Sequence, residues 1–449
     1  MKMILIAKGG KMKLGAKKGS KFALTGMALA LGWNVQAYAD EAASKLPVVK
    51  VTANQIQDKT ITPSTLQLQQ ASSMSDVFRT DPSVDIGGGG VNAQRIYLNG
   101  VEGTNLNITI DGARQGRSLF QHRGGLTGID PSLLKKVEAK TAGGQQGPGA
   151  LGGSISFETM DAQDLLKGEK AYGAKVRTGY ASADKSKQGG VSVYGQAGKH
   201  LGLLAHVAAA DRDDYRTGGG DKVLRSASDD RDYFLKFSLL DLNDHQVRLS
   251  LNQHKSSGIY ARGSNGSDAG ILPDPLPTTG PSVPVSQEVE RKSYSLDHRY
   301  QPINPWLDWR ANVYLSENEV SYPGSIATPI STEEQGFAIS NSALFERDAW
   351  WFKATLGIDY LSEDSTTSAY KVNSENTGFY LQNNLGWHDL TITVGARLDN
   401  YVAEYRFIEL DDKDVSPNVG LTYAFTPEVS VLVAMKRLCV PVVLCLLGF

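Results

Sequence analysis

Residues 94–159 read QRIYLNGVEGTNLNITIDGARQGRSLFQHRGGLTGIDPSLLKKVEAKTAGGQQGPGALGGSISFET, and this stretch decides the fold that we expect. The β-prone runs at residues 108–110 and 154–159 predict two short strands. The first run ends at Asp111-Gly112, a dipeptide typical of tight turns. A glycine-rich bend at residues 143–153 precedes the second run. The stretch therefore predicts a small unit of strands and sharp turns.

The same stretch carries a helix signal. Asp130 suits a helix N-cap, and Pro131 suits the first helical position because its missing N–H needs no partner there. Leu133, Leu134 and Val137 follow at a spacing that would place them on one helix face. The sequence thus predicts an α/β unit with a helix that begins at Asp130.

The first 39 residues have the pattern of a secretory signal. A lysine-rich start precedes a mostly apolar run at residues 22–31, and Ala37-Tyr38-Ala39 supplies a small-x-small cleavage pattern. The apolar run is shorter than the ~20 residues that a membrane-spanning helix needs. We therefore expect residues 1–39 to be removed after export, which leaves residues 40–53 as a short polar segment that ends in a β-prone run.

Residues 54–165 are expected to form the whole α/β unit. Met74 to Arg79 fits a short amphipathic helix, ended by Asp81-Pro82, and residues 84–86 fit a strand. The glycine run at residues 87–90 lacks the Lys-Ser/Thr that completes a phosphate-binding loop. We therefore do not predict a nucleotide site there.

From about residue 172 the chain becomes a series of alternating strands. Residues 309–316 and 390–399, for example, alternate apolar with polar side chains. About thirteen such segments fall between residues 172 and 435, each near the ~10 residues of a membrane-spanning strand. Tight connections, as at residues 240–245, contrast with long ones, as at residues 254–290. We predict a mainly β fold, with a transmembrane antiparallel β-barrel over residues 166–435 after the α/β domain.

A soluble β-sandwich would show the same alternation. The aromatic residues near the strand ends favour the barrel, because amphipathic rings settle at the level of the lipid headgroups. These residues are Trp306, Trp350, Trp351, Trp387 and Tyr401.

Residues 436–449 break the pattern. They form an apolar run without alternation, which contains both cysteines, Cys439 and Cys445. We interpret this tail as the result of a shifted reading frame or an early stop, so that the barrel is incomplete. The residues before the tail have no cysteine for a disulfide or a thiolate metal site.

The composition excludes one class of function. A net charge of −2 provides no basic footprint for nucleic acid. The mean hydropathy of −0.27 is that of a soluble protein, but the alternating strands of a membrane barrel produce only a weak hydropathy signal. The composition therefore argues against nucleic-acid binding and leaves the barrel open.

The order of these features resembles the TonB-dependent outer-membrane receptors of Gram-negative bacteria. The segments 110–112 (IDG), 129–131 (IDP), 136–138 (KVE) and 149–155 (GALGGSI) match the pattern of their plug domain. The resemblance implies that residues 54–165 form a plug inside a barrel. The barrel of this family has about 22 strands, of which about thirteen are present here.

The β-prone run before the α/β unit resembles the TonB box of these receptors. It consists of Val48, Val49, Lys50, Val51, Thr52 and Ala53. Taken alone the run would be an ordinary edge strand, but an exposed strand can also add to the sheet of a partner through main-chain hydrogen bonds. The resemblance implies two partners, the TonB energy-transducing complex and the outer-membrane lipid.

Within the family, haem and haemoglobin receptors fit best, on the segments 111–116 (DGARQG), 129–131 and 157–166 (FETMDAQDLL). Those receptors carry a plug histidine between the first two segments, where this chain has His122. A neutral imidazole is a good axial ligand for haem iron. Guanidinium groups suit carboxylates such as the haem propionates, which implies binding roles for Arg114, Arg117 and Arg123.

Each of these residues also has a simpler interpretation, as an exposed loop histidine or a solvated loop charge. His254 opens the long connection and His298 lies on a predicted strand, so that either could face a ligand. The family places its second haem-ligating histidine beyond a Phe-Arg-Ala-Pro type motif, which is absent here. His122 is therefore the one predicted iron ligand.

We expect a receptor that binds haem or a haem-carrying protein at the cell surface and imports haem iron into the periplasm. It would be no enzyme and hold no intrinsic cofactor, since haem is the transported ligand. The alternatives are a ferric-siderophore receptor of the same fold, an exported adhesin or non-energised porin, and a non-functional truncated product.

Overall fold

The computed structural model divides the chain into residues 1–53 and 54–449. The structure describes residues 58–87, 94–115, 128–140, 147, 152–261, 284–325, 328–367, 371–405, 408–425 and 430–436. The predicted signal peptide, the predicted TonB box and residues 437–449 lie outside these ranges. No helix in the described ranges is long and apolar enough to cross a lipid bilayer.

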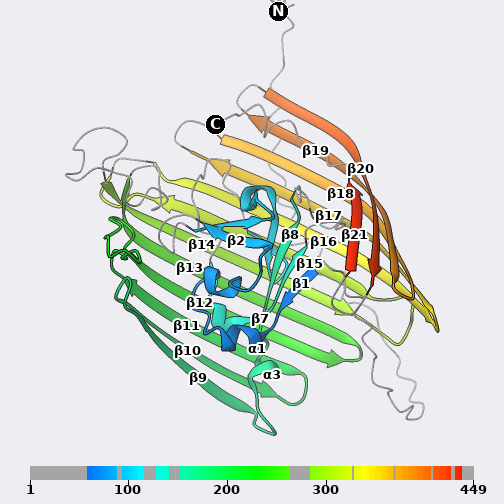
Figure 1. Ribbon diagram of the computed structural model, residues 1–449, viewed down its shortest axis with the longest axis horizontal. Helices are drawn as coiled ribbons and strands as arrows, with labels where there is room; N and C mark the ends of the chain where they lie inside the picture. The colour runs from blue at the N-terminus through cyan, green and yellow to red at the C-terminus, as the bar shows by residue number, and fades with distance from the viewer. Residues whose placement is uncertain are drawn as a thin grey trace, which may run out of the picture. The chain divides into compact units, whose positions relative to one another are not determined.

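The first part of the described chain, here called the plug unit, consists of short elements around two small sheets (Figure 1). One sheet has the strand order β1-β7-β8-β5-β6 and the other has the order β2-β3-β4. The elements are β1 (Asp58–Ile61), α1 (Pro63–Leu68), α2 (Met74–Val77), β2 (Val84–Gly87), β3 (Arg95–Leu98), β4 (Val101–Glu102), η3 (Gly103–Asn105), β5 (Asn107–Ile110), β6 (Ala113–Arg114), η4 (Pro131–Leu133), β7 (Leu134–Lys140), β8 (Ser154–Thr159) and α3 (Ala162–Leu165).

The alternation of β5 and β8 builds the core of the larger sheet. Ile108 and Ile110 of β5 are buried, as are Ile155 and Phe157 of β8. The two strands run parallel, with Ile108 opposite Ile155 and Ile110 opposite Phe157. Burial of each such side chain contributes about 1.5–3 kcal/mol. The strands predicted at residues 108–110 and 154–159 are confirmed.

The predicted turn at Asp111-Gly112 is also confirmed. It joins β5 to β6 as a two-residue hairpin loop, with Ile110 paired to Ala113. Both turn residues have positive φ, 47° at Asp111 and 82° at Gly112. This is the combination that two-residue hairpins require, because it matches the twist of the flanking strands.

The helix predicted from Asp130 is wrong. The Asp130 carboxylate does cap a turn, accepting the Ser132 N–H at 2.7 Å, but this turn is the short 3-10 helix η4, and the strand β7 follows it. β7 pairs with β1 on one side and with β8 on the other. Two ladders of main-chain hydrogen bonds and the burial of Leu134, Val137 and Ala139 outweigh the local helix signal.

The helix predicted at residues 74–79 exists in a shorter form, as α2. Ser73 caps it, and the Asp76 carboxylate accepts the Ser73 N–H at 3.0 Å in return. Met74 and Val77 are buried. The capping box thus fixes where the helix begins, as the sequence indicated.

The remainder of the described chain forms one antiparallel sheet of thirteen strands, here called the wall. Each strand pairs with its neighbours in sequence, and β9 and β21 lie at the two edges. The predicted number of strands is therefore confirmed. The strands are β9 (Tyr172–Ala181), β10 (Ser186–Ala197), β11 (Leu201–Arg212), β12 (Ser228–Leu242), β13 (His245–Ala261), β14 (Pro284–Tyr300), β15 (Trp309–Ser321), β16 (Ile330–Arg347), β17 (Trp350–Thr366), β18 (Lys371–Trp387), β19 (Leu390–Tyr405), β20 (Ile408–Ala424) and β21 (Ser430–Lys436).

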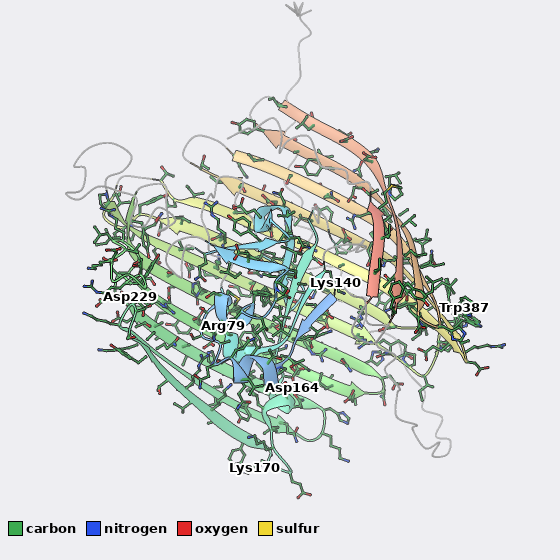
Figure 2. The ribbon with its side chains drawn as sticks, viewed as in Figure 1. Arg79, Lys140, Asp164, Lys170, Asp229 and Trp387 are labelled. Atoms are coloured by element: carbon green, nitrogen blue, oxygen red, sulfur yellow. The ribbon has the colours of Figure 1, made fainter. Side chains whose placement is uncertain are left out.

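The two ends of the wall differ. One end, here called the turn end, has tight connections such as the one between Leu242 and His245. The opposite end, here called the loop end, carries the long connection between Ala261 and Pro284. Figure 2 shows Trp387 at the turn end and Asp229 at the loop end. This asymmetry is typical of outer-membrane barrels.

Three of the tryptophans predicted for the aromatic belt are exposed at the turn end, while Trp351 beside them is half-buried. Trp306, Trp350 and Trp387 have 63%, 41% and 58% of their surface accessible, as the predicted aromatic belt at the lipid headgroups requires.

The prediction for His254 is wrong in one respect. His254 lies within β13 and does not open the long connection, because alternation continues as far as Ala261.

Side chains on the wall alternate between two faces. Lys236, Ser250 and Ser295 lie opposite one another on β12, β13 and β14, and each donates a hydrogen bond to the plug unit. Residues one position away, such as Leu249 and Tyr294, are exposed on the other face. The wall therefore presents polar groups to the plug unit and apolar groups outward.

Candidate ligand-binding and plug-docking site

The described ranges end at Gln115 and resume at Gly128, on either side of the segment that carries His122. A backbone carbonyl near each of these two points is hydrogen-bonded to the wall. On one side, the Ser316 hydroxyl donates to the carbonyl of Arg114 at 2.7 Å. On the other side, the Asn252 amide donates to the carbonyl of Gly128 at 2.6 Å. Asn252 and Ser316 each lie opposite Ser293 of β14, so that both attachments are at the same height on the wall.

Gly128 fits closely against the wall. A Cβ atom at this position would lie 3.4 Å from Cδ of Arg291 and 3.6 Å from Cβ of His254. Arg291 and His254 are themselves opposite one another on β14 and β13. These are ordinary van der Waals distances, so the backbone at Gly128 lies against the wall with room for a Cβ atom.

Arg114 already has a carboxylate partner. Its side chain is almost fully buried, and its Nη1 lies 3.4 Å from Oε1 of Glu334 on β16. Burial lowers the pKa of the Arg114 guanidinium, but the charges of Glu334 and Glu363 outweigh burial and raise it. A haem propionate at Arg114 would therefore have to compete with Glu334.

Asp111 is the centre of a polar cluster between plug and wall. Within the plug unit, its carboxylate accepts the Thr159 N–H at 2.9 Å and the Thr159 hydroxyl at 2.6 Å. From the wall, the Ser250 hydroxyl donates to the same carboxylate at 2.9 Å. Lys236 donates to the carbonyl and the hydroxyl of Thr159, at 2.9 and 2.8 Å. The turn predicted from the sequence thus docks the plug unit onto β12 and β13.

Asp161 adds a buried anion to this cluster. It accepts from Nε of Arg248 at 3.1 and 3.2 Å, and Nζ of Lys236 lies 3.5 Å from it. Burial alone would raise the pKa of Asp161, but Lys236, Arg248, Ser238 and Lys135 lower it to about 2. The carboxylate is therefore ionised and firmly held by the wall at neutral pH.

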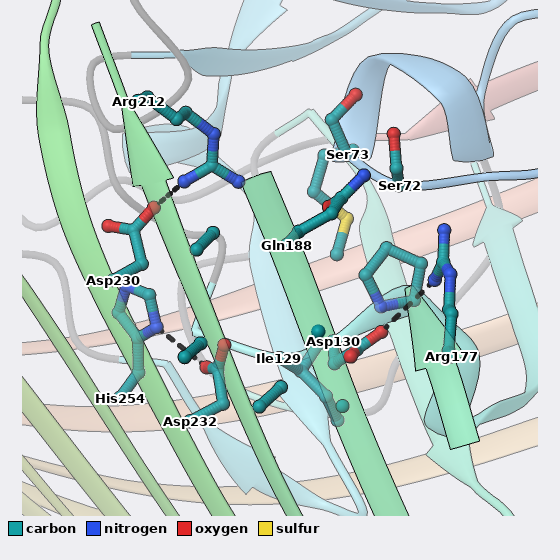
Figure 3. A pocket seen from close by; sticks show the side chains of 17 residues that line it. Ser72, Ser73, Ile129, Asp130, Arg177, Gln188, Arg212, Asp230, Asp232 and His254 are labelled. Carbon is teal, nitrogen blue, oxygen red and sulfur yellow. Dashed lines mark hydrogen bonds and ion pairs between the residues drawn. The ribbon is translucent and has the colours of Figure 1, made fainter. Parts of the chain in front are cut away.

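A cavity of about 70 Å³ lies between the plug unit and strands β9 to β13. Figure 3 shows Asp130 and Arg177 on one side of it, and Arg212, Asp230, Asp232 and His254 on the other. The polar groups around it are paired: Arg177 lies 3.5 Å from Asp130, Nδ1 of His254 is hydrogen-bonded to Asp232 at 2.7 Å, and Arg212 forms an ion pair with Asp230. The cavity has room for water but is too small for a macrocycle.

Asp130 links this cavity to the wall. Its Oδ2 lies 3.3 Å from Nε2 of the buried His206, whose Nδ1 bonds to the Ser192 hydroxyl at 2.8 Å. Burial raises the pKa of Asp130, but the contact with His206, the Ser132 N–H and Arg177 lower it to about 2. The residue predicted as a helix cap is therefore also a docking residue.

Of the predicted haem-binding residues, Arg114 is within the described ranges, whereas His122, Arg117 and Arg123 are outside them. Within the described ranges no group of three or more His, Cys, Asp or Glu side chains could hold a metal ion. The docking residues Lys236, Arg248 and Asp161 were not among the site residues predicted from the sequence. Lys236 stands at an inward position of an alternating strand, and that pattern does not reveal which residue it pairs with.

Comparisons with known proteins agree with this architecture. Residues 50–154 match the family model described as TonB-dependent Receptor Plug Domain, and residues 210–434 match the model described as TonB dependent receptor-like, beta-barrel. The first match spans β1 to the start of β8, and the second spans most of the wall.

Among curated proteins, the chain is 24% identical to the heme transporter BhuA of Brucella ovis, over 82% of this chain and 56% of that protein. It is also 24% identical to the heme/hemopexin utilization protein C of Haemophilus influenzae, over 80% of this chain and 56% of the relative. The chain thus spans little more than half the length of these relatives.

Among solved structures, the FrpB iron transporter of Neisseria meningitidis has the same fold. The two superpose with a TM-score of 0.71 at 23% sequence identity, over 85% of this chain and 63% of that one.

Proposed function

Because the chain belongs to the family of TonB-dependent receptors, we propose that it binds haem or a haem-carrying protein at the cell surface and passes haem iron to the periplasm. Two relatives named for haem, each matched over about four fifths of this chain, support this ligand. In this proposal residues 54–165 are the plug domain, residues 166–435 belong to the outer-membrane barrel, and haem is the transported ligand.

The observation that carries the proposal is that the described segments on either side of residues 116–127 meet the wall at the same height. Arg114 is bonded to β15 and Gly128 to β13. In the proposal His122, which lies between them in the sequence, provides the iron ligand, since imidazole nitrogen is a common axial ligand of haem iron. In the proposal Arg117 and Arg123 pair with the propionates, and Arg114 contributes only if its contact with Glu334 opens.

Haem titration of the full chain in detergent micelles tests the iron ligand. We expect the Soret band of haem to shift on binding to the wild type and to lose that shift in His122→Ala. His200→Ala is the matched control, because the His200 ring is held at the turn end by the carbonyl of Leu240. No shift in the wild type, or an equal loss in the control, would contradict the proposal.

Haem dimethyl ester tests the arginines separately, because its propionates carry no charge. Arg117→Gln and Arg123→Gln should weaken the binding of haem but leave the binding of the ester unchanged. Each charge-assisted hydrogen bond contributes about 1.5–3 kcal/mol, so a loss of about tenfold or more is expected for haem. An equal loss for both ligands would assign the arginines to loop structure instead.

Coupling to the TonB complex has its own test. We expect deletion of residues 46–53 to abolish energised haem uptake by cells while haem binding to the purified receptor is kept. The β-prone run from Val48 to Ala53 would provide the strand that adds to the partner. An adhesin or a non-energised porin would function unchanged without these residues.

A ferric-siderophore receptor of the same fold is the second candidate. The chain shares its fold with an iron transporter of known structure, and this fold is compatible with either ligand. A ferric siderophore would quench tryptophan fluorescence on binding with no dependence on His122. Haem would bind only with His122 present, and this difference separates the two candidates.

A further inference from the structure

Two histidines meet on the wall at the turn end, on the face opposite the one that carries the plug-docking residues. His245 is the first residue of β13 and lies opposite Tyr300 of β14. His298 lies two residues before Tyr300, opposite Val247. The pair thus lies at the start of β13 and near the end of β14, two strands that Figure 1 labels.

The two imidazole rings face each other nitrogen to nitrogen. Nδ1 of His245 lies 3.0 Å from Nε2 of His298. The ring planes differ by only 13°, and the ring centres are 5.3 Å apart. With a 3.0 Å nitrogen contact, this geometry means that the rings lie nearly in one plane and share a proton edge to edge. Tyr300 stacks on His245 with a centre distance of 4.4 Å.

The pair lies on the outward face of the wall. The inward face of β13 carries Ser250 and Asn252, which bond to the plug unit. Because side chains alternate along a strand, the odd-numbered residues from His245 to Leu249 point the other way, and Leu249 is 40% exposed. The adjoining turn residues Asp241 and Asn243 are exposed. The pair therefore has access to water at the edge of the apolar surface.

The nitrogen separation suits a metal ion. Metal–imidazole bonds are about 2.0–2.1 Å long, so two nitrogens at right angles around one ion would be roughly 3 Å apart. The two nitrogens now point at each other, so metal binding requires both rings to tilt until their lone pairs point at one ion. Neutral imidazole is a preferred ligand of Zn²⁺, Cu²⁺ and Ni²⁺.

We propose that His245 and His298 form a two-imidazole site for a divalent transition-metal ion. In this site the ion takes the place of the hydrogen-bonded proton, which moves to the other nitrogen of the same neutral imidazole, and the ion joins the start of β13 to the end of β14. No third His, Cys, Asp or Glu completes a metal group within the described ranges, so water fills the remaining positions. The Irving–Williams order then predicts that Cu²⁺ binds more tightly than Ni²⁺ or Zn²⁺. The site is independent of the proposed haem transport.

Cu²⁺ titration of the full chain without a histidine tag, in detergent micelles, tests the site. We expect the electron paramagnetic resonance spectrum to show one ion with two nitrogen ligands. His245→Ala and His298→Ala should each weaken binding by more than about tenfold, since even outer-shell partners of metal ligands contribute tenfold or more. His200→Ala is the control, because His200 lies near the same end of the wall and its Nδ1 is bonded to a backbone carbonyl.

Three outcomes would overturn the proposal. They are a wild-type spectrum with no ion bound through two nitrogens, the same spectrum in either single variant, and an equal loss in His200→Ala. The far-ultraviolet circular dichroism of each variant is compared with that of the wild type. If a variant loses its β-structure, His245→Gln and His298→Gln replace the alanine variants, because glutamine keeps a polar side chain of similar length.

Discussion

Lys236 of β12 donates to both the carbonyl and the hydroxyl of Thr159, at 2.9 and 2.8 Å, although the two residues are 77 positions apart in the chain. Both are fully buried. Lys236 also lies 3.4 Å from Asp111 and 3.5 Å from Asp161. One wall cation thus holds the ends of β5 and β8 together.

Lys236→Met should loosen the plug unit. The substitution keeps most of the side-chain volume but leaves Asp111 and Asp161 buried without this cation. Removal of one partner from a buried ion pair costs about 3–5 kcal/mol. We expect a loss of that size in the free energy of unfolding, measured with urea in detergent micelles, and faster protease cleavage between plug and wall. Lys199→Met, at an exposed turn residue, should change the free energy of unfolding by less than about 0.5 kcal/mol. Equal effects of the two substitutions would contradict this role for Lys236.

Acid should weaken the same contact through Asp161. Its pKa is about 2 in the folded chain against an ordinary value of 3.8. A carboxyl group with a lowered folded pKa stabilises the fold above its unfolded pKa, and this stabilisation is lost as the pH falls from about 4 toward 2. The difference corresponds to about 2 kcal/mol.

Urea unfolding between pH 5 and pH 2 measures this loss, and Asp161→Asn should make the pH dependence shallower. Some dependence will remain, because the pKa of Asp130 is also about 2. Glu169→Gln, at an exposed residue, should show the same dependence of unfolding free energy on pH as the wild type. An unchanged profile in Asp161→Asn would disprove the assignment.

The sequence predicted what depends on local spacing. The alternation in residues 309–316 and 390–399 identified β15 and β19, and Asp111-Gly112 identified the hairpin, because each pattern is complete within a few residues. The helix expected from Asp130 failed for the opposite reason. β7 is a strand because of its partners β1 and β8, which are distant in sequence.

The docking residues could not be predicted from the sequence, for a similar reason. Asp161 appeared within the segment 157–166 that matched the haem receptors, but nothing in that segment indicates that Arg248 and Lys236 would surround its carboxylate. Which wall side chain meets which plug residue depends on how the plug unit is docked against β12 and β13. Alternation along a strand fixes the face that a residue is on, but not its partner in the other unit.

A comparison of Gly112→Ala with Gly198→Ala separates the cost of backbone strain from the cost of steric crowding. Gly112 has a φ of 82°, and a Cβ there would lie 2.5 Å from Nδ2 of Asn312. Gly198 also has a positive φ, 64°, but its Cβ would meet nothing within 4 Å. Alanine at Gly198 should therefore cost only the left-handed strain of about 1–2 kcal/mol.

Alanine at Gly112 should cost about 1 kcal/mol more, because Asn312 must give up its hydrogen bond to the carbonyl of Asp111. Urea unfolding of the two variants measures the difference. Equal losses would mean that Asn312 moves aside without cost and that the turn is not held by β15.

Arg114 and Glu334 should behave as one unit. Both are almost fully buried, and they form an ion pair between the plug unit and the wall, with 3.4 Å between Nη1 of Arg114 and Oε1 of Glu334. Arg114→Gln leaves the carboxylate of Glu334 buried without this cation, and Glu334→Gln leaves Arg114 without this anion. Each should lower the free energy of unfolding by about 3–5 kcal/mol.

The double variant should lose much less than the sum of the two, since two neutral amides can bond to each other where the ions stood. Haem affinity provides a second measurement on the same variants. If Arg114 only docks the plug unit, Glu334→Gln will leave haem affinity unchanged. If Arg114 is free to bind a propionate once Glu334 is neutral, Glu334→Gln will increase affinity for haem but not for haem dimethyl ester. Additive losses in unfolding free energy would show that the ion pair stabilises nothing as a pair.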